Sequence, residues 1–206
     1  DSRVYAYGSA MRFPAALVVC ALSAAPLSAQ TSVRYALAPS AVGADGLSSV
    51  LRVTLALPRD AGAPSATLIM PRAIPMGYAQ VAYDQFVTVT AARSRSGAAA
   101  SIKRGEGPRW SVASASAADP LASIEYEVDL AAMEANVVAG GDSSRARDGF
   151  VGLLGYSVFA YVEGFEDRAV ELAISPPPNR LDWPVFSTLA PKAPALPGPM
   201  KAVAGD

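Results

Sequence analysis

The sequence predicts an all-β protein, an antiparallel β-sandwich with one short helix. Several short stretches alternate apolar and polar residues with a period of two, which is typical of strands that bury one face. Turn-forming residues rich in Gly, Pro and Asp separate these stretches at residues 43–46, 58–62 and 105–108. No long stretch has the period of about 3.6 residues that marks a helix. Many short strands between turns favour two packed antiparallel sheets.

The clearest strand is expected at residues 122–130. Ile124, Tyr126, Val128 and Leu130 face one side there, while acidic residues face the other. The remaining strands are expected, in chain order, at residues 33–37, 50–57, 66–70, 86–89, 98–103, 109–112, 156–162, 169–175 and 185–189. One helix is expected at residues 130–138, where its apolar side chains would pack on the edge of a sheet.

The composition excludes several kinds of chemistry. The chain has 206 residues, 17 Lys and Arg against 18 Asp and Glu, one Cys and no His. A net charge of -1 gives no general attraction for nucleic acid. Without histidine there is no Ser-His-Asp triad and no His-containing zinc site, and one cysteine cannot form an internal disulfide. We therefore expect no catalytic residue, no metal ligand and no cofactor in this chain.

The two ends of the chain are expected to lie outside the folded domain. Residues 11–29 have the layout of a signal peptide, with Met11, Arg12, an apolar run and small residues before Ala29. Residues 1–10 are interpreted as an upstream extension, and cleavage after Ala29 would leave an exported protein, periplasmic or secreted, with no stable membrane span. The β-sandwich is expected at residues 30–190, and the Pro-rich residues 191–206 as a linker to a missing domain. The abundance of Arg and Ala fits a GC-rich bacterial gene.

Two patterns that resemble chemical sites have simpler interpretations. Glu125, Glu127 and Asp129 share one face of a predicted strand, where a solvated face that resists edge pairing is far more common than a cation site. Glycines at positions 149, 152 and 155 resemble a phosphate-binding loop, but no Lys-Ser or Lys-Thr pair follows them. Neither pattern predicts a binding site.

Residues 70–87 are the least ordinary segment. Two prolines and a glycine predict a stiff excursion between strands that presents Arg72, Tyr78, Tyr83 and Asp84. Aromatic rings and an arginine on a rigid loop are suited to anchor an interface, because little side-chain entropy is lost on docking. These four residues are the candidate interface. The alternative is that Tyr78 and Tyr83 pack over the end of the sandwich.

The same segment carries a family resemblance. Pro71, Pro75, Gly77 and Tyr78, followed by Tyr83 and Asp84, resemble a motif in the N-terminal domain of the glycyl-aminopeptidase-like metallopeptidases. These are exported gluzincins that often carry a PDZ domain. The resemblance covers about residues 32–190 and continues through residues 107–110, 124–128, 149–150, 155–164 and 183–186.

The resemblance implies a β-rich domain without chemistry of its own. The family's zinc ligands lie in a His-Glu-x-x-His helix, and no residue of this chain can be matched to it, because the chain has no histidine. We therefore expect the non-catalytic N-terminal domain of an exported zinc aminopeptidase-like protein, which packs on a catalytic domain absent from this chain and shapes its cleft. The alternative is a stand-alone secreted binding module that contacts a peptide or protein through residues 71–84.

Overall fold

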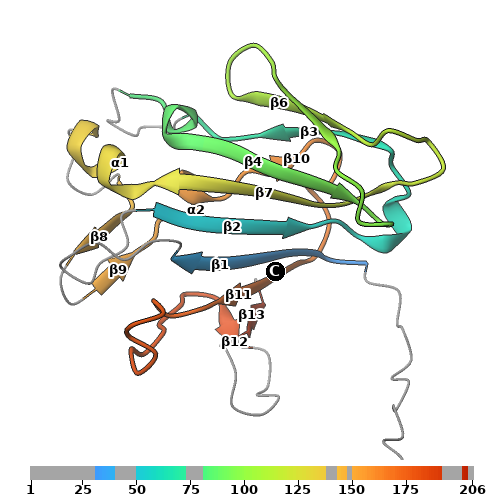
Figure 1. Cartoon of the computed structure of the whole chain (residues 1–206). Helices are drawn as coiled ribbons and strands as arrows, with labels where there is room; N and C mark the ends of the chain where they lie inside the picture. Colours follow the sequence, from blue (N-terminus) through green and yellow to red (C-terminus); the bar gives the residue numbers. More distant parts are fainter. Residues whose placement is uncertain are drawn as a thin grey trace, which may run out of the picture.

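Two β-sheets packed face to face form most of the computed structural model, which describes residues 31–39, 50–72, 81–137, 143–147, 150–191 and 201–203 (Figure 1). The larger sheet has the strand order β12-β13-β11-β1-β2-β7-β4. Its strands are β1 (Val33–Pro39), β2 (Val50–Ala56), β4 (Val87–Ser94), β7 (Leu121–Asp129), β11 (Val170–Ile174), β12 (Ala190–Pro191) and β13 (Lys201–Val203).

The smaller sheet has the order β10-β3-β6-β5. Its strands are β3 (Ser65–Ile69), β5 (Ser101–Arg104), β6 (Arg109–Ala113) and β10 (Tyr161–Val162). A separate hairpin pairs β8 (Arg145–Arg147) with β9 (Phe150–Gly152). The helical elements are α1 (Leu130–Asn136), α2 (Gly155–Val158) and two 3-10 turns, η1 (Arg59–Ala61) and η2 (Tyr83–Phe86).

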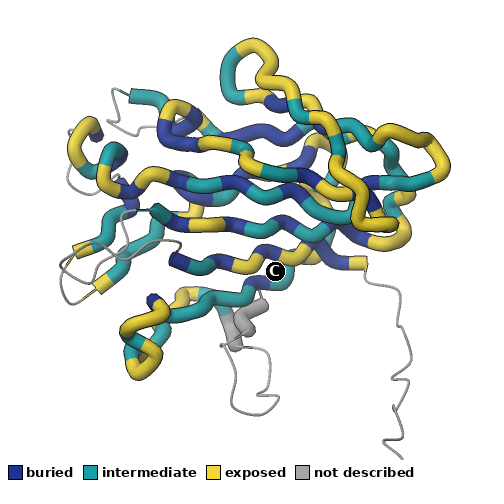
Figure 2. The backbone as a smooth tube through the Cα atoms, viewed as in Figure 1, coloured by how far each residue is buried: buried dark blue, intermediate teal, exposed yellow. Residues whose placement is uncertain are grey.

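The core lies between the two sheets and follows the alternation of the sequence. Leu51, Val53 and Leu55 of β2 are buried, as are Ile124, Tyr126 and Val128 of the neighbouring β7. Leu68, Trp110 and Val112 of the smaller sheet join the same apolar cluster. Figure 2 shows the alternation of buried and more exposed positions along these strands. The predicted β-sandwich is confirmed.

One strand pair departs from the expected antiparallel arrangement. β1 and β11 run parallel, with Val33 opposite Val170 and Leu37 opposite Ile174. The Val33 amide donates to Ala169 O at 2.9 Å, and the Ser175 amide donates to Leu37 O at 2.9 Å. A period of two predicts which face of a strand is buried but not its direction, so the sequence could not have shown this pairing.

The strand expected at residues 156–162 is wrong in its first half. Residues 155–158 form the short helix α2, and only Tyr161 and Val162 extend, as β10. The hydroxyls of Tyr35 and Tyr126 bond the backbone of this segment, in place of the bonds of a strand ladder. The structure therefore has a second short α-helix, α2, in addition to the expected α1.

The strand expected at residues 185–189 is also absent, because this segment has no regular structure. Pro184, which precedes this segment, has no amide hydrogen to donate to a strand ladder.

The expected helix α1 ends two residues earlier than predicted, at Asn136. Its first turn is capped by Asp129, which accepts from the Ala132 amide at 2.8 Å.

The limits of the domain stay predictions. The strand β12 spans the expected boundary at residues 190–191, and β13 lies within the expected linker; both extend the larger sheet beyond β11. The expected extension and signal peptide, residues 1–29, lie outside the described residues. In the part of the chain that the structure describes, no helix has the length and apolar character needed to span a membrane.

Candidate functional site

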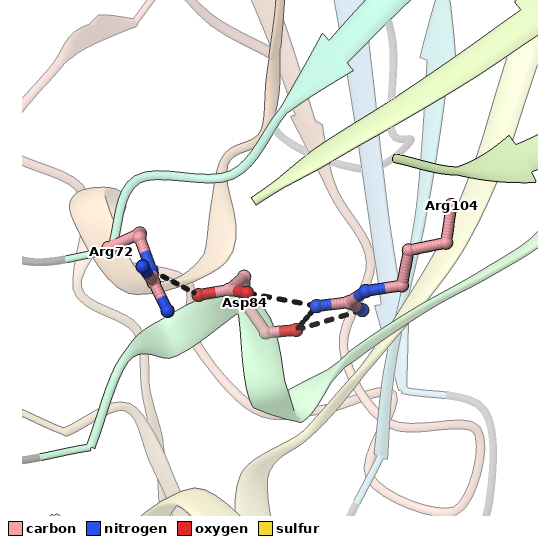
Figure 3. Close-up of polar contacts among 3 residues, drawn as sticks. All are labelled: Arg72, Asp84 and Arg104. Atoms are coloured by element: carbon pink, nitrogen blue, oxygen red, sulfur yellow. Dashed lines mark hydrogen bonds and ion pairs between the residues drawn. The ribbon is translucent and has the colours of Figure 1, made fainter. Parts of the chain in front are cut away.

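The most unusual polar feature is a buried carboxylate between two arginines. Asp84 lies in η2 and is only 2% exposed. Its Oδ1 accepts from Arg72 Nε at 3.2 Å, and its Oδ2 accepts from Arg104 Nη2 at 2.9 Å. Figure 3 shows the two guanidinium groups on opposite sides of Asp84. Since a buried charge is costly unless it is paired, these contacts hold the carboxylate in place.

Three elements bring these side chains together. Arg72 follows β3, and its carbonyl accepts from the Tyr83 amide at 3.2 Å, which fixes the start of η2 next to the end of β3. Arg104 ends β5 and lies over the ring of Trp110, 4.6 Å from the ring centre. Its Nη1 also donates to Asp84 O at 3.4 Å. The cluster therefore ties η2 to β5 and to the segment that follows β3; both strands belong to the smaller sheet.

The predicted interface residues divide between the interior and the surface. Tyr83 is fully buried, with its ring 5.8 Å from that of Tyr156, so it packs at the end of the sandwich as the alternative predicted. Asp84 is buried too and is held inside the molecule by its two ion pairs. The side chain of Arg72 is 56% exposed, which leaves it free to contact solvent or a partner. Tyr78 lies outside the described residues.

The expectation that Asp84 is presented at the surface together with Tyr83 is wrong, for a physical reason. Proline and glycine limit the backbone of a loop, but they do not decide which side of the loop faces the core. The aromatic Tyr83 gains more from burial than from exposure, and a buried position next to Arg104 gives Asp84 a partner. Of the four predicted residues, the structure brings Arg72 and Asp84 into direct contact.

Two buried tyrosines form a second polar group, whose hydrogen bonds the sequence did not predict. The Tyr35 hydroxyl donates to Ala160 O at 2.9 Å, and the Tyr126 hydroxyl donates to Val158 O at 2.9 Å while it accepts from the Ala160 amide at 3.0 Å. Burial raises the pKa of Tyr35 to about 12 and also raises the pKa of Tyr126. Both hydroxyls are therefore protonated at neutral pH and act as fixed donors rather than as acids.

Comparison with known proteins decides the family. The model of the peptidase M61 N-terminal domain matches residues 44–198. The chain belongs to this family. The match includes the Asp84 cluster and most strands of both sheets, and it confirms the resemblance to the glycyl-aminopeptidase-like metallopeptidases.

The M61 N-terminal domain also has a similar solved structure. An aminopeptidase N family protein from Idiomarina loihiensis matches it with a TM-score of 0.61 and 17% sequence identity. The match covers 84% of this chain and 27% of the other chain, so the chain spans about a quarter of the length of that protein. At this identity the likeness shows a shared fold. No curated protein matches the sequence.

The zinc chemistry of the metallopeptidase family does not fit the residues of this domain. The chain has no histidine, and in the described residues no three His, Cys, Asp or Glu side chains gather where they could hold a metal ion. The acidic strand face of β7 has other contacts: Glu127 pairs with Arg52 at 3.1 Å, and Asp129 caps α1. What is recognised here is the N-terminal domain of the family, without its catalytic part.

Large apolar side chains are exposed in the segment that follows β11. Leu181 is 74% exposed and Phe186 is 88% exposed. Two hydrogen-bonded turns order the backbone from residue 177 to residue 183. The Arg180 amide donates to Pro177 O at 2.9 Å, and the Trp183 amide donates to Arg180 O at 3.0 Å. We call residues 176–189 the apolar segment. Its two large exposed apolar side chains, Leu181 and Phe186, are five residues apart.

Proposed function

We propose that this M61 N-terminal domain is the non-catalytic domain of an exported zinc aminopeptidase-like protein, in which it packs on a catalytic domain and shapes the cleft. The observation that supports this most strongly is the family match over residues 44–198. The similar solved chain is almost four times as long as the part that the domain matches. In such a protein the domain would supply walls and a fixed surface, while the metal and its ligands would come from the other part of the chain.

The apolar segment is the surface that we propose for this packing. Covering one exposed side chain of the size of Leu181 or Phe186 stabilises a complex by about 1.5–3 kcal/mol. The segment also lies near the C-terminal end of the matched region, where the chain of an N-terminal domain leads towards the rest of the protein. Both the exposed apolar side chains and the position in the chain therefore favour the apolar segment as the surface that contacts the catalytic domain.

Export belongs to the same proposal. The support is the signal-like sequence of residues 11–29 and the single cysteine, which lies within that sequence at position 20. A mature domain without cysteine folds by burial and hydrogen bonding, and it needs no particular redox compartment. Cell fractionation of a bacterial host that expresses residues 1–206 tests this part: we expect the domain in the periplasm or medium with Gln30 as its first residue.

The packing is tested with a separately expressed catalytic domain of an M61 peptidase from which the peptidase's own N-terminal domain has been removed. We expect a one-to-one complex with residues 30–206 in sedimentation velocity, weakened at least tenfold by Phe186→Asp. The peptidase's own N-terminal domain, added separately, is the positive control. Binding of that control without binding of this domain would contradict the proposal.

The alternative of a stand-alone binding module keeps one supporting observation, the exposure of Arg72. Tyr83 and Asp84 are buried, so a partner would have to contact the loop through other residues. Under this alternative Arg72→Ala would abolish binding of a peptide or protein and Phe186→Asp would not. Under the proposal that we favour, the order of the two effects is reversed.

A further inference from the structure

A hollow lies at the other end of β4 from the Asp84 cluster. Five residues line it: Ala56 at the end of β2, Leu57 directly after it, Arg59 in η1, Arg95 in the turn after β4, and Ala122 at the start of β7. Its volume is about 340 Å³. That is within the range of sites that bind small molecules. In Figure 1 this is the right-hand end of the larger sheet.

Backbone contacts hold Arg95 in position at this hollow. Its Nη2 donates to Pro58 O at 3.1 Å and to Arg59 O at 2.6 Å. The Arg95 amide donates to Pro120 O at 2.9 Å, which fixes the turn to the residue before β7. Nε and Nη1 of Arg95 make no such contact in the described residues. A guanidinium held this way loses little freedom when it binds a ligand.

Among the residues that the structure describes, the two arginines of the hollow, Arg59 and Arg95, form no ion pair. By contrast, the arginines at positions 34, 52, 72, 104, 109, 147 and 168 each have one. The nearest acids bond other groups, although the Asp119 carboxylate lies at the same turn as Arg95, close to the Arg95 amide. Asp60 pairs with Arg168 at 2.7 Å, and Asp119 accepts from the Ser96 amide and hydroxyl.

The rest of the lining is apolar. Leu57 is buried, and its amide donates to Ala122 O at 2.8 Å, so this amide is not available to a ligand. Ala56 and Ala122 add two methyl groups. A ligand that fits both parts of the hollow has an anionic end for the guanidinium groups and an aliphatic group for the methyl and isobutyl side chains.

We propose that Arg59 and Arg95 form a binding site for a small aliphatic carboxylate. Nη2 of Arg95 is already bonded to two carbonyls, so a carboxylate oxygen would accept a single charge-assisted bond from Nε or Nη1 of Arg95. The free C-terminal residue of a short peptide and a free aliphatic acid share this chemistry. The site does not depend on the proposed packing against a catalytic domain, because its residues lie outside the apolar segment.

The first experiment compares matched ligands on the chain spanning residues 30–206. Chemical-shift titration by NMR is carried out with N-acetyl-leucine, with isovalerate, with the uncharged N-acetyl-leucinamide and with inorganic phosphate. We expect both carboxylates to shift the amides of residues 56–62 and 95, and the leucinamide to shift none. Stronger binding of N-acetyl-leucine than of isovalerate identifies a peptide end as the ligand, and the reverse identifies a free acid. Phosphate binding as strong as that of the carboxylates would overturn the proposal, because charge alone would then be recognised.

Three variants keep the test independent of folding. Arg59→Gln removes a side chain that has no ion pair in the described residues, so the fold should be unchanged while binding weakens about tenfold, which is about 1.4 kcal/mol. Arg95→Gln should weaken binding at least as much. Arg109→Gln, which removes a similarly exposed arginine paired with Glu163, is the control. Unchanged affinity in folded Arg59→Gln and Arg95→Gln would overturn the proposal, as would an equal loss in Arg109→Gln.

Discussion

Asp84 shows how a single buried charge can organise one end of a sandwich. Two arginines compensate it, and one of them also lies over Trp110, so the carboxylate connects η2 with the smaller sheet. Glu127, Glu134, Glu163 and Asp60 each pair with one arginine and lie at the surface, where such pairs contribute little. The energetic weight of the ion pairs therefore lies at Asp84.

The variant Asp84→Asn tests this. It keeps the volume of the side chain but removes its charge, so charge-assisted hydrogen bonds to Arg72 and Arg104 weaken. We expect a loss of about 1–3 kcal/mol in the free energy of unfolding, measured with urea. Asp167→Asn, the same change at an exposed position, is the control and should have almost no effect. Equal stabilities of the two variants would show that the Asp84 cluster contributes nothing.

The buried tyrosines predict the pH dependence of stability. The pKa of Tyr35 is about 12 in the folded protein and near 10.0 in the unfolded chain, and burial raises the pKa of Tyr126 as well. The folded state then holds protons that the unfolded state releases. The stability is complete below about pH 10 and falls as the pH rises to about 12, by up to about 1.4 kcal/mol per pH unit for each tyrosine.

Urea unfolding at several pH values between 9 and 12 measures this fall. The variant Tyr35→Phe should make the profile less steep, because it removes one of the two shifted groups, whereas Tyr161→Phe, at an exposed position, should not. A profile as steep in Tyr35→Phe as in the parent chain would contradict the assignment.

At the level of the elements, the strands were the part that the sequence predicted best. β2 buries alternate residues over its whole length, and β7 does so from Ile124 to Asp129, as the period of two predicts. The direction of β11, the helix α2 and the irregular apolar segment were not predictable in this way. Each depends on contacts between distant residues, such as those from Tyr35 and Tyr126 to the backbone at Ala160.

The cap of α1 gives a prediction for one element. Asp129 accepts from the Ala132 amide at 2.8 Å, and the helix has only seven residues, so it has few other bonds at its start. Asp129→Ala should lower the free energy of unfolding by about 1 kcal/mol. Asp129→Asn keeps an oxygen that can accept and should lose less than half of that amount. A full loss in the asparagine variant would show that the charge, and not the cap, is what matters.

At the scale of the whole molecule, the core between the sheets takes Leu189 from the apolar segment but leaves Phe186 outside. Phe186 is almost fully exposed, so Phe186→Asp should leave the free energy of unfolding within about 0.5 kcal/mol of the parent. Leu55→Ala, in the core, should lower it by about 2–5 kcal/mol. Strong destabilisation by Phe186→Asp in urea unfolding would mean that the segment supports the domain itself and is not kept for a partner.

The family was also accessible from the sequence, while the site was only partly so. The absence of histidine excluded the zinc site, and the residues from Pro71 to Asp84 carried the resemblance. The burial of Tyr83 and the hollow at Arg59 and Arg95 depend on how the segments at the two ends of the sandwich pack against each other. No local pattern of residues records that packing.

We propose that this domain carries no peptidase chemistry of its own and serves a catalytic domain supplied elsewhere. The most direct test is hydrolysis of aminoacyl p-nitroanilides by purified residues 30–206 in the presence of zinc, with the metal content measured on the same sample. The account predicts no turnover above the buffer rate and no zinc retained after gel filtration. Turnover that rises in proportion to the concentration of the domain, or one tightly held zinc ion per chain, would contradict it.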